Sequence, residues 1–179
     1  MLIQVDHIHF TYSGGVKALD DVSLMIQPGE KVALIGENGS GKTTLARHLN
    51  GLLRPQSGSI RVGDWQTTQH SPAKLAQRVA YVFQNPDEQL FRQRVWDEVA
   101  FGPQNLGCRP EQVRDRVEHA LALMGLGAVS QINPRDLGYS GRKRVAFASA
   151  IAMQTPVLIF DEPTAGLDAK EQEQLGQVI

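Results

Sequence analysis

The residues with the clearest potential for chemistry form a glycine-rich run that leads into Lys42 and Thr43. The run reads Gly-Glu-Asn-Gly-Ser-Gly-Lys-Thr, which matches the phosphate-loop pattern G-x-x-x-x-G-K-[ST]. Glycines let the backbone wrap a phosphate with its N–H groups inward, and a helix N-terminus adds partial positive charge. We expect Lys42 to reach the β- and γ-phosphates and Thr43 to ligate Mg²⁺. The predicted nucleoside-triphosphate site consists of Gly36, Glu37, Asn38, Gly39, Ser40, Gly41, Lys42, Thr43 and Thr44.

Two adjacent carboxylates, Asp161 and Glu162, follow the apolar run Val157–Phe160. Ligands of open α/β sheets bind beyond the carboxyl ends of the strands, so both acids are expected at such an edge. There Asp161 can hold Mg²⁺, and Glu162 can orient or deprotonate a water that attacks the γ-phosphate. The alternative is an ordinary strand end with solvated acids, which the phosphate loop makes the weaker interpretation.

A strand and a helix must flank the phosphate loop for it to work. Lys31–Ile35 is a compact apolar run, typical of a strand that is buried on both faces. The four leucines between Leu45 and Leu53 fall at i, i+4, i+7 and i+8, which predicts a helix. His48 lies within that helix, and we expect it at the surface.

The rest of the chain alternates between strand and helix signals. Further strands are predicted at Leu2–Phe10, Ser23–Gln27, Ser59–Val62, Val79–Phe83 and Val157–Phe160, the last two fully buried. A helix opens at Pro110 and ends before Gly125, and another spans Gly141–Met153. The pattern predicts an α/β chain, with a parallel-sheet core at both ends and a helical insertion at roughly Asn85–Arg144.

Composition excludes several classes of protein. The 179 residues carry a net charge of −1, so no basic nucleic-acid footprint is expected. The single cysteine, Cys108, forms no internal disulfide, and no apolar run approaches the roughly 20 residues of a membrane span. The N-terminus lacks the pattern of a signal peptide. A soluble cytoplasmic chain is therefore expected.

The order of these motifs resembles the ATP-binding subunits of ABC transporters. Asp161–Asp168 reads Asp-Glu-Pro-Thr-Ala-Gly-Leu-Asp, which beside the phosphate loop is highly specific to that family, and the similarity covers the whole chain. The resemblance implies an α/β fold with a P-loop NTPase (RecA-like) core, an N-terminal antiparallel β-subdomain and an inserted helical subdomain. Residues 1–84 and 145–179 would form the core, and 85–144 the helical subdomain.

The same resemblance implies roles for single residues, with ATP and Mg²⁺ as ligands. Tyr12 would stack on adenine, although a tyrosine near a glycine turn usually just packs. Gln84 would sense Mg²⁺ and the γ-phosphate, although a glutamine in a loop is usually solvated. Asp161 would hold metal and Glu162 would be the catalytic base. Ala165–Asp168 would be the D-loop, which meets the partner subunit.

A narrower resemblance concerns Asn85–Phe91 and Val95–Pro103. These stretches are similar to the energy-coupling-factor importers, which take up cobalt and vitamins. In that group the segment Asn85–Phe101 would contact the membrane-spanning subunit, with Phe91 or Trp96 against one of its helices. The alternative is an amphipathic loop and helix start that pack on the insertion itself.

The family signature Leu-Ser-Gly-Gly-Gln is altered here. It aligns on Leu137-Gly138-Tyr139-Ser140-Gly141, so the signature serine and first glycine are replaced by glycine and tyrosine. Leu137, Ser140 and Gly141 are the expected signature residues. Either Ser140 takes over the contact with the γ-phosphate held by the other subunit, or the signature is degenerate, as in asymmetric pairs of cassettes.

Only 11 residues follow Asp168. Leu175, Val178 and Ile179 are expected on one helix face. The family's next strand and its switch histidine would lie beyond Ile179, so we expect the chain to be a fragment of a longer ATPase.

The leading functional prediction is the ATPase of an importer for a vitamin or metal ion. It would work at the cytoplasmic face of the membrane, bound to a membrane-spanning subunit and paired with a second ABC subunit or cassette. One rival is a soluble ABC ATPase that acts on DNA or ribosomes, which would show a basic face or long coiled-coil insertions. A second rival is a fragment that binds nucleotide only weakly.

Overall fold

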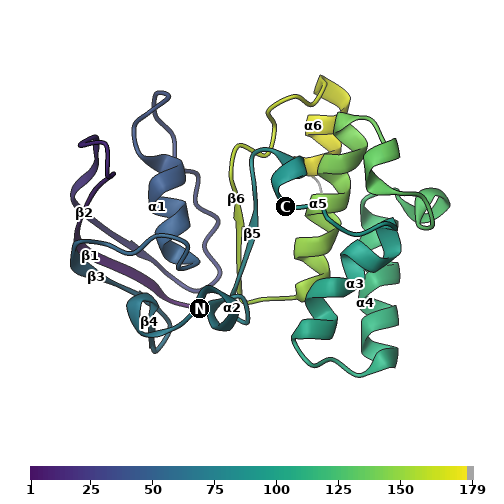
Figure 1. Ribbon diagram of the computed structural model, residues 1–179, viewed down its shortest axis with the longest axis horizontal. Coiled ribbons are helices and arrows are strands. Elements are labelled where there is room, and N and C mark those ends of the chain that lie inside the picture. Colours follow the sequence, from purple (N-terminus) through teal and green to yellow (C-terminus); the bar gives the residue numbers. More distant parts are fainter. Residues whose placement is uncertain (177–179) are drawn as a thin grey trace. The chain divides into compact units, whose positions relative to one another are not determined.

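The computed structural model describes residues 1–176 and contains two compact units (Figure 1). Unit 1 comprises residues 1–79 with 155–157, and unit 2 comprises 80–154 with the chain from 158 onward. The expected division into a core of 1–84 with 145–179 and a helical subdomain of 85–144 remains a prediction. Val178 and Ile179, expected on a helix face, lie outside the described residues.

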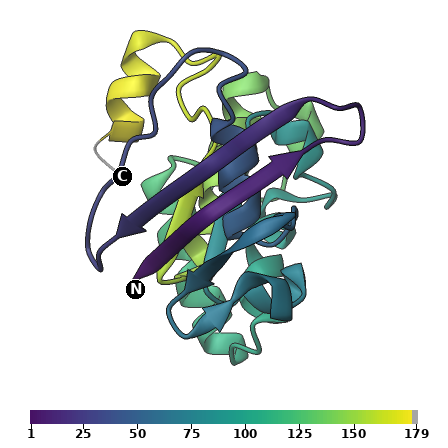
Figure 2. The ribbon, with the colours of Figure 1, turned by 90° about the vertical axis from the view of Figure 1, so that its left-hand side faces the viewer.

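Unit 1 is built on an antiparallel sheet with the strand order β2-β1-β3-β4 (Figure 2). Its strands are β1 (Ile3–Thr11), β2 (Lys17–Ile26), β3 (Ser57–Val62) and β4 (Trp65–Gln66). Ile3 pairs with Ile26 on one side and with Val62 on the other, so β1 lies in the middle of the sheet. The predicted antiparallel N-terminal subdomain is therefore confirmed.

Helix α1 (Lys42–Leu49) lies beside this sheet, as Figure 2 shows. Leu45 and Leu49 of the helix are buried, as are Ile8 and Ile60 of the sheet, so they form an apolar core. The observed helix ends at Leu49, before the last two leucines of the predicted pattern, because the chain turns at Gly51, where φ is +76°. A one-turn helix, α2 (Pro72–Leu75), completes unit 1 and is capped by Ser71.

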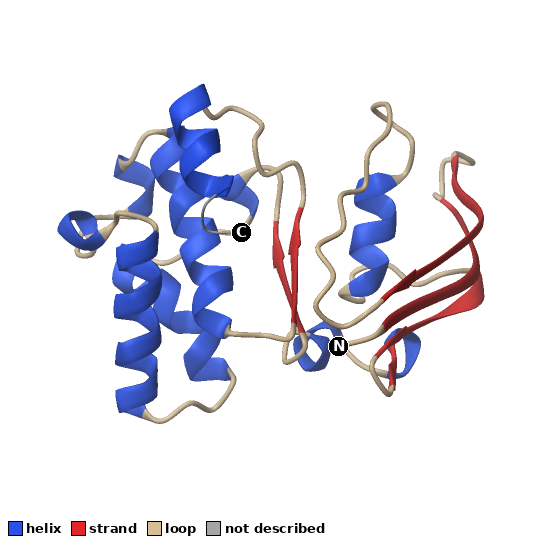
Figure 3. Ribbon diagram, turned by 180° about the vertical axis from the view of Figure 1, so that it is seen from behind, coloured by secondary structure: helices blue, strands red, loops and turns tan. Residues whose placement is uncertain are grey.

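The prediction of a strand at Lys31–Ile35 is wrong. Residues 27–40 form a loop between β2 and α1, without regular structure at 31–35 (Figure 3). This loop is exposed, and Ile35 is 91% exposed. An apolar run becomes a buried strand only if neighbouring strands satisfy its backbone N–H and C=O groups. Within residues 1–176, no strand pairs with this run.

Strands β5 (Val79–Val82) and β6 (Val157–Phe160) form a separate two-stranded sheet. Val157 N donates to Arg78 O and Asp161 N donates to Val82 O, so both strands advance by the same step and run parallel. β5 is largely buried, as predicted. The prediction that β6 is fully buried is wrong, because Leu158 is 39% exposed.

Helices make up most of unit 2 (Figure 3). They are α3 (Val95–Asn105), α4 (Pro110–Leu123), α5 (Tyr139–Met153) and α6 (Ala169–Gly176), with short 3₁₀ turns at Pro86–Glu88, Gly127–Val129 and Pro134–Asp136. Helices α3, α4 and α5 pack on one another around Val99, Val117 and Phe147, which are at most 1% exposed. Among the helices described up to residue 176, none has the length and apolar character to cross a bilayer.

His48 is buried rather than exposed, contrary to the sequence-based expectation. It lies on the sheet-facing side of α1, next to Leu49 and edge-on to the ring of Phe10. Its Nδ1 donates to the carbonyl oxygen of Thr44 at 2.7 Å. Burial lowers the pKa of His48, because desolvation disfavours the charged imidazolium.

The burial of neutral His48 predicts acid sensitivity of unit 1. The unfolded chain takes up this proton below about pH 6.5, while the folded chain resists it, so the free energy of unfolding falls as pH drops below that value. Thermal unfolding at about pH 7.5 and 5.5 measures the difference. In His48→Gln the pH-dependent fall should shrink. His7→Gln is the control, because Asp21 raises the pKa of exposed His7 and its contribution has the opposite sign. An unchanged pH dependence in His48→Gln would contradict the prediction.

Candidate nucleotide site

The phosphate-loop motif lies in unit 1, at the start of α1. Lys42 is the first residue of the helix, and its ammonium group donates to the carbonyls of Gly36 and Glu37 at 2.9 and 2.8 Å. The lysine side chain therefore folds back over the loop that precedes it. The exposed loop and the first N–H groups of α1 together provide the donors that phosphate binding needs.

Glycine is required at two positions of this loop. Gly39 and Gly41 have φ angles of +83° and +90°, in the left-handed region that side chains disfavour. A Cβ at Gly41 would also lie 2.5 Å from the carbonyl oxygen of Ala18 on β2. Close contact with β2 therefore holds the end of the loop where α1 begins.

Tyr12 lies next to this motif in unit 1. Its hydroxyl is 3.0 Å from Thr44 Oγ1, and its ring packs edge-on against Phe10. Tyr12 is 39% exposed, so one part of the ring packs while another remains open to solvent. Stacking of Tyr12 on adenine stays a prediction, and its contact with Thr44 places it beside the predicted phosphate-binding residues.

The acidic pair lies in unit 2, directly after β6. Asp161 is 7% exposed, and its Oδ2 accepts a 2.8 Å hydrogen bond from the hydroxyl of Tyr81 on the neighbouring β5. Its backbone N–H is bonded to the carbonyl of Val82. A nearly buried carboxylate held in this way is suited to ligate a hard cation such as Mg²⁺, which prefers oxygen ligands. No sequence signal marks Tyr81 as a site residue, because it lies within the predicted buried strand Val79–Phe83.

Glu162 contacts the predicted sensor glutamine. Gln84 Nε2 donates to Glu162 Oε2 at 2.5 Å, so the structure brings together two residues that are 78 positions apart. Glu162 has φ of +46°, which for a residue with a side chain costs on the order of 1–3 kcal/mol. Such strain persists only where the surroundings impose it.

A residue that sequence reasoning did not single out holds the Glu162 turn. Lys143 on α5 is 1% exposed, and its ammonium group donates to the carbonyls of Glu162, Pro163 and Ala165 at 2.9, 3.1 and 2.7 Å. Burial lowers the pKa of Lys143, and the Glu162 carboxylate opposes that shift. The sequence signal for a buried Lys143 is its spacing of four residues from the apolar Phe147, which places both on one face of a helix otherwise rich in alanine.

The altered signature forms the first turn of α5, after Gly138. The Tyr139 hydroxyl donates to the carbonyl of Gln84 at 3.4 Å. Its ring lies against Gly166, where a Cβ would be 2.5 Å from Tyr139 Cε1. The tyrosine that replaces a signature glycine therefore packs on the predicted D-loop of its own chain.

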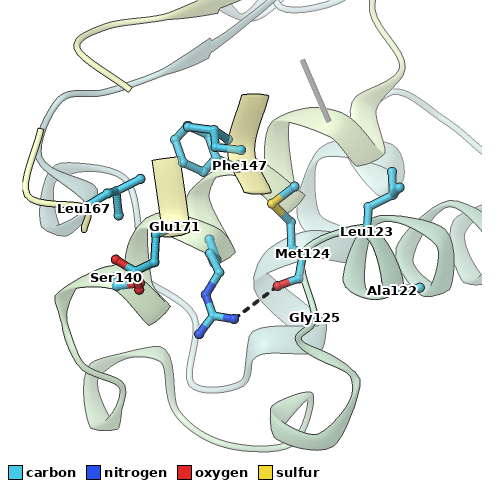
Figure 4. Close-up of a pocket in the computed structure, with 10 residues that line it drawn as sticks. Ala122, Leu123, Met124, Gly125, Ser140, Phe147, Leu167 and Glu171 are labelled. Carbon is cyan, nitrogen blue, oxygen red and sulfur yellow. Dashed lines mark hydrogen bonds between the residues drawn. The ribbon is translucent and has the colours of Figure 1, made fainter. Parts of the chain in front are cut away.

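Ser140 lies beside a pocket of about 320 Å³ (Figure 4). Its hydroxyl donates to the carboxylate of Glu171, which also accepts from the backbone N–H of Asp168. Asp168 in turn accepts from the N–H of Glu171, so the two residues cap the start of α6. The pocket itself is lined mainly by apolar side chains, including Phe147 and Leu167. The contact of Ser140 with a phosphate stays a prediction.

Comparison with known proteins decides the family. The sequence profile of the ABC transporter family matches residues 19–165, which include the phosphate loop and the acidic pair. The chain belongs to the ABC transporter family. The cobalt import ATP-binding protein CbiO of Rhodobacter capsulatus is 45% identical over 177 residues, which are 97% of this chain and 63% of that protein.

Solved ABC structures share the fold. The structure of cbiO1 from Clostridium perfringens, part of the ABC transporter complex cbiONQ, has a TM-score of 0.84 and 35% identity, over 98% of this chain and 71% of that chain. The dimeric cassette MJ0796 bound to ADP and Pi has a TM-score of 0.89 and 26% identity, over 98% and 80%. The chain spans between 32% and 63% of the length of the first three curated relatives it matches.

Proposed function

We propose that this ABC chain binds and hydrolyses Mg·ATP. The observation that carries the proposal is the hydrogen bond from Gln84 to Glu162, next to the buried Asp161 at the end of β6, in a chain that also has a complete phosphate loop. The carboxylate of Asp161 and the hydroxyl of Thr43 would each supply an oxygen ligand, the kind of ligand that Mg²⁺ prefers. The ion typically uses one or two protein ligands beside the substrate phosphates. When bound, Mg²⁺ would neutralise charge on the phosphates.

In the proposed reaction the Glu162 carboxylate accepts a proton from water while the water oxygen attacks the γ-phosphorus. The bond from γ-phosphorus to the bridging oxygen breaks, and ADP and phosphate leave. Lys42 stabilises charge on the β- and γ-phosphates, and Gln84 holds the carboxylate of Glu162 through its amide. Steady-state phosphate release by the intact protein, with Mg²⁺ and after its removal by a chelator, tests this function. Release that is independent of Mg²⁺ would contradict it.

We infer an importer of the energy-coupling-factor type as the setting of this ATPase. CbiO of Rhodobacter capsulatus is named as a cobalt import protein and cbiO1 as part of a transporter complex, and both resemble this chain over nearly its whole length. The cargo would be a metal ion or vitamin. A second ABC subunit or cassette would complete the ATPase, in keeping with the dimeric cassette described above. The assembly would lie at the cytoplasmic face of the membrane.

The segment Asn85–Phe101 supports the proposed contact with a membrane subunit. Of its large apolar residues, Leu90 and Val95 are buried and Trp96 packs against the helical core, whereas Phe91 is 56% exposed. The Phe91 ring packs edge-on against Phe101, below the guanidinium of Arg92. The structure therefore favours Phe91 over Trp96 as the docking residue.

A buried carboxylate holds Phe91 in place. Glu98 on α3 is 3% exposed, and its Oε2 accepts hydrogen bonds from the backbone N–H groups of Phe91 and Arg92 at 2.8 and 2.6 Å. The loop is therefore fixed to the helix by charge-assisted bonds, which are about twice as strong as neutral ones. An aromatic ring on a rigid support is suited to fill a hydrophobic pocket on a partner.

Phe91→Asp should abolish co-purification with the membrane subunit while ATP affinity remains normal. A charge at the centre of an apolar contact typically removes a contribution of about 2 kcal/mol or more. Leu123→Asp is the control, because Leu123 is an exposed apolar residue on α4 of the same unit. Joint loss of ATP binding and folding in Phe91→Asp would show that the segment is ordinary core.

A further inference from the structure

The buried ammonium group of Lys143 has a full set of partners, and all of them lie in one turn. A lysine has three N–H donors and no acceptor. Here the three accepting carbonyls, those of Glu162, Pro163 and Ala165, lie within four consecutive residues. Lys143 therefore joins α5 to the turn that carries the proposed catalytic base.

This turn needs an external support. Glu162 has a left-handed backbone, which a residue with a side chain keeps only when its surroundings impose it. The carbonyl of Glu162 is one of the three that Lys143 binds, while its carboxylate is bonded to Gln84. Backbone and side chain of Glu162 are thus held from two directions.

Tyr139 binds the same region one helical turn earlier on α5. Its ring lies against Gly166, and its hydroxyl donates to the carbonyl of Gln84. Residues four apart lie on the same face of a helix, so Tyr139 and Lys143 present one surface to the Glu162 turn. The Lys143 ammonium lies 5.9 Å from the centre of the Tyr139 ring.

We propose that Lys143 is a positioning residue for ATP hydrolysis, which sets the orientation of Glu162 by binding the carbonyls of residues 162, 163 and 165. This inference rests on the proposed ATPase function. It adds a residue that acts through the backbone of the base. Loss of the ammonium group would remove the Lys143 donor from all three carbonyls, of which that of Glu162 would keep only the N–H of Ala165, and the turn would relax.

The test compares Lys143→Met with Lys143→Arg in the intact protein. Methionine keeps a similar length without a donor, so kcat should fall by about 10- to 100-fold, since a misplacement of about 1 Å has such effects. The KM for ATP should stay within about twofold, because binding of the substrate is not changed. Arginine retains N–H donors and should restore much of kcat.

Arg144→Met is the matched control. Arg144 is the next residue on α5, and its guanidinium donates to the carbonyl of Met124 rather than to a carbonyl of the Glu162 turn. Arg144→Met should leave kcat near the parent value. A variant that merely weakens α5 is thereby distinguished from one that loses the positioning of Glu162. A kcat for Lys143→Met within twofold of the parent, or an equal loss in Arg144→Met, would overturn the proposal.

Two further measurements separate this inference from the proposed function. If Lys143 acts through Glu162, Lys143→Met should cause no further loss of kcat in a Glu162→Gln background. An additive loss of kcat would overturn the proposal. Hydrogen exchange of the amides in Asp161–Asp168 should be faster in Lys143→Met than in Arg144→Met, and this readout needs no hydrolysis. Unchanged exchange overturns the positioning role, while a Glu162→Gln protein that hydrolyses ATP normally overturns the role of the base.

Discussion

Glu162→Gln is expected to lower ATP turnover by about 10²- to 10⁴-fold and to leave ATP binding intact. Glutamine keeps the size of the side chain and can still accept a hydrogen bond, but it cannot take the proton from the attacking water. Steady-state phosphate release gives the rate, and titration with a fluorescent ATP analogue gives the affinity. Size exclusion with ATP should also show a trapped nucleotide-bound dimer.

Glu173→Gln serves as the control for this variant. Glu173 is an exposed carboxylate on α6, a few residues beyond the D-loop, and should behave as the parent. A Glu162→Gln protein that hydrolyses ATP at the parent rate would remove Glu162 from the mechanism. The hydrogen bond between Gln84 and Glu162 would then be structural only.

Lys42→Ala should weaken ATP binding by roughly 10- to 150-fold. The variant removes a point charge and its charge-assisted hydrogen bonds to the β- and γ-phosphates, worth about 1.5–3 kcal/mol. Titration with a fluorescent ATP analogue measures the effect. Because the attraction is electrostatic, the difference between parent and variant should narrow at high salt.

Lys74→Ala is the matched control for the phosphate-loop lysine. Lys74 is an exposed lysine of unit 1 on α2, with its ammonium group over the ring of Trp65. It changes the net charge by the same amount without touching the phosphate loop. Equal ATP affinity in the parent and Lys42→Ala would refute the role assigned to Lys42.

Most elements followed from local signals in the sequence. The helix predicted at 110–124 is α4, Pro110–Leu123, because proline at its start and glycine past its end mark its limits. The strands β1, β3 and β5 lie within two residues of the predicted bounds, since alternation and apolar runs are read over short windows.

Two errors have a common cause. Lys31–Ile35 was predicted as a strand and His48 as a surface residue. The true conformation of the first and the burial of the second both depend on which elements the fold places beside them. An extended run becomes a strand only when another strand bonds to it. A histidine on a helix is buried when its face meets a sheet, as the neighbouring leucines of α1 already indicated.

The sequence by itself predicted the chemistry proposed for this protein, because the phosphate loop and the Asp161–Glu162 pair are contiguous motifs whose residue types are those expected for phosphate and metal binding. The tertiary structure alone decided how Glu162 is held. Lys143 lies about 20 residues from the carbonyls it binds, and Gln84 lies 78 residues from the carboxylate it contacts. Backbone carbonyls are the same in every residue, so no sequence pattern marks which of them a buried lysine will bind.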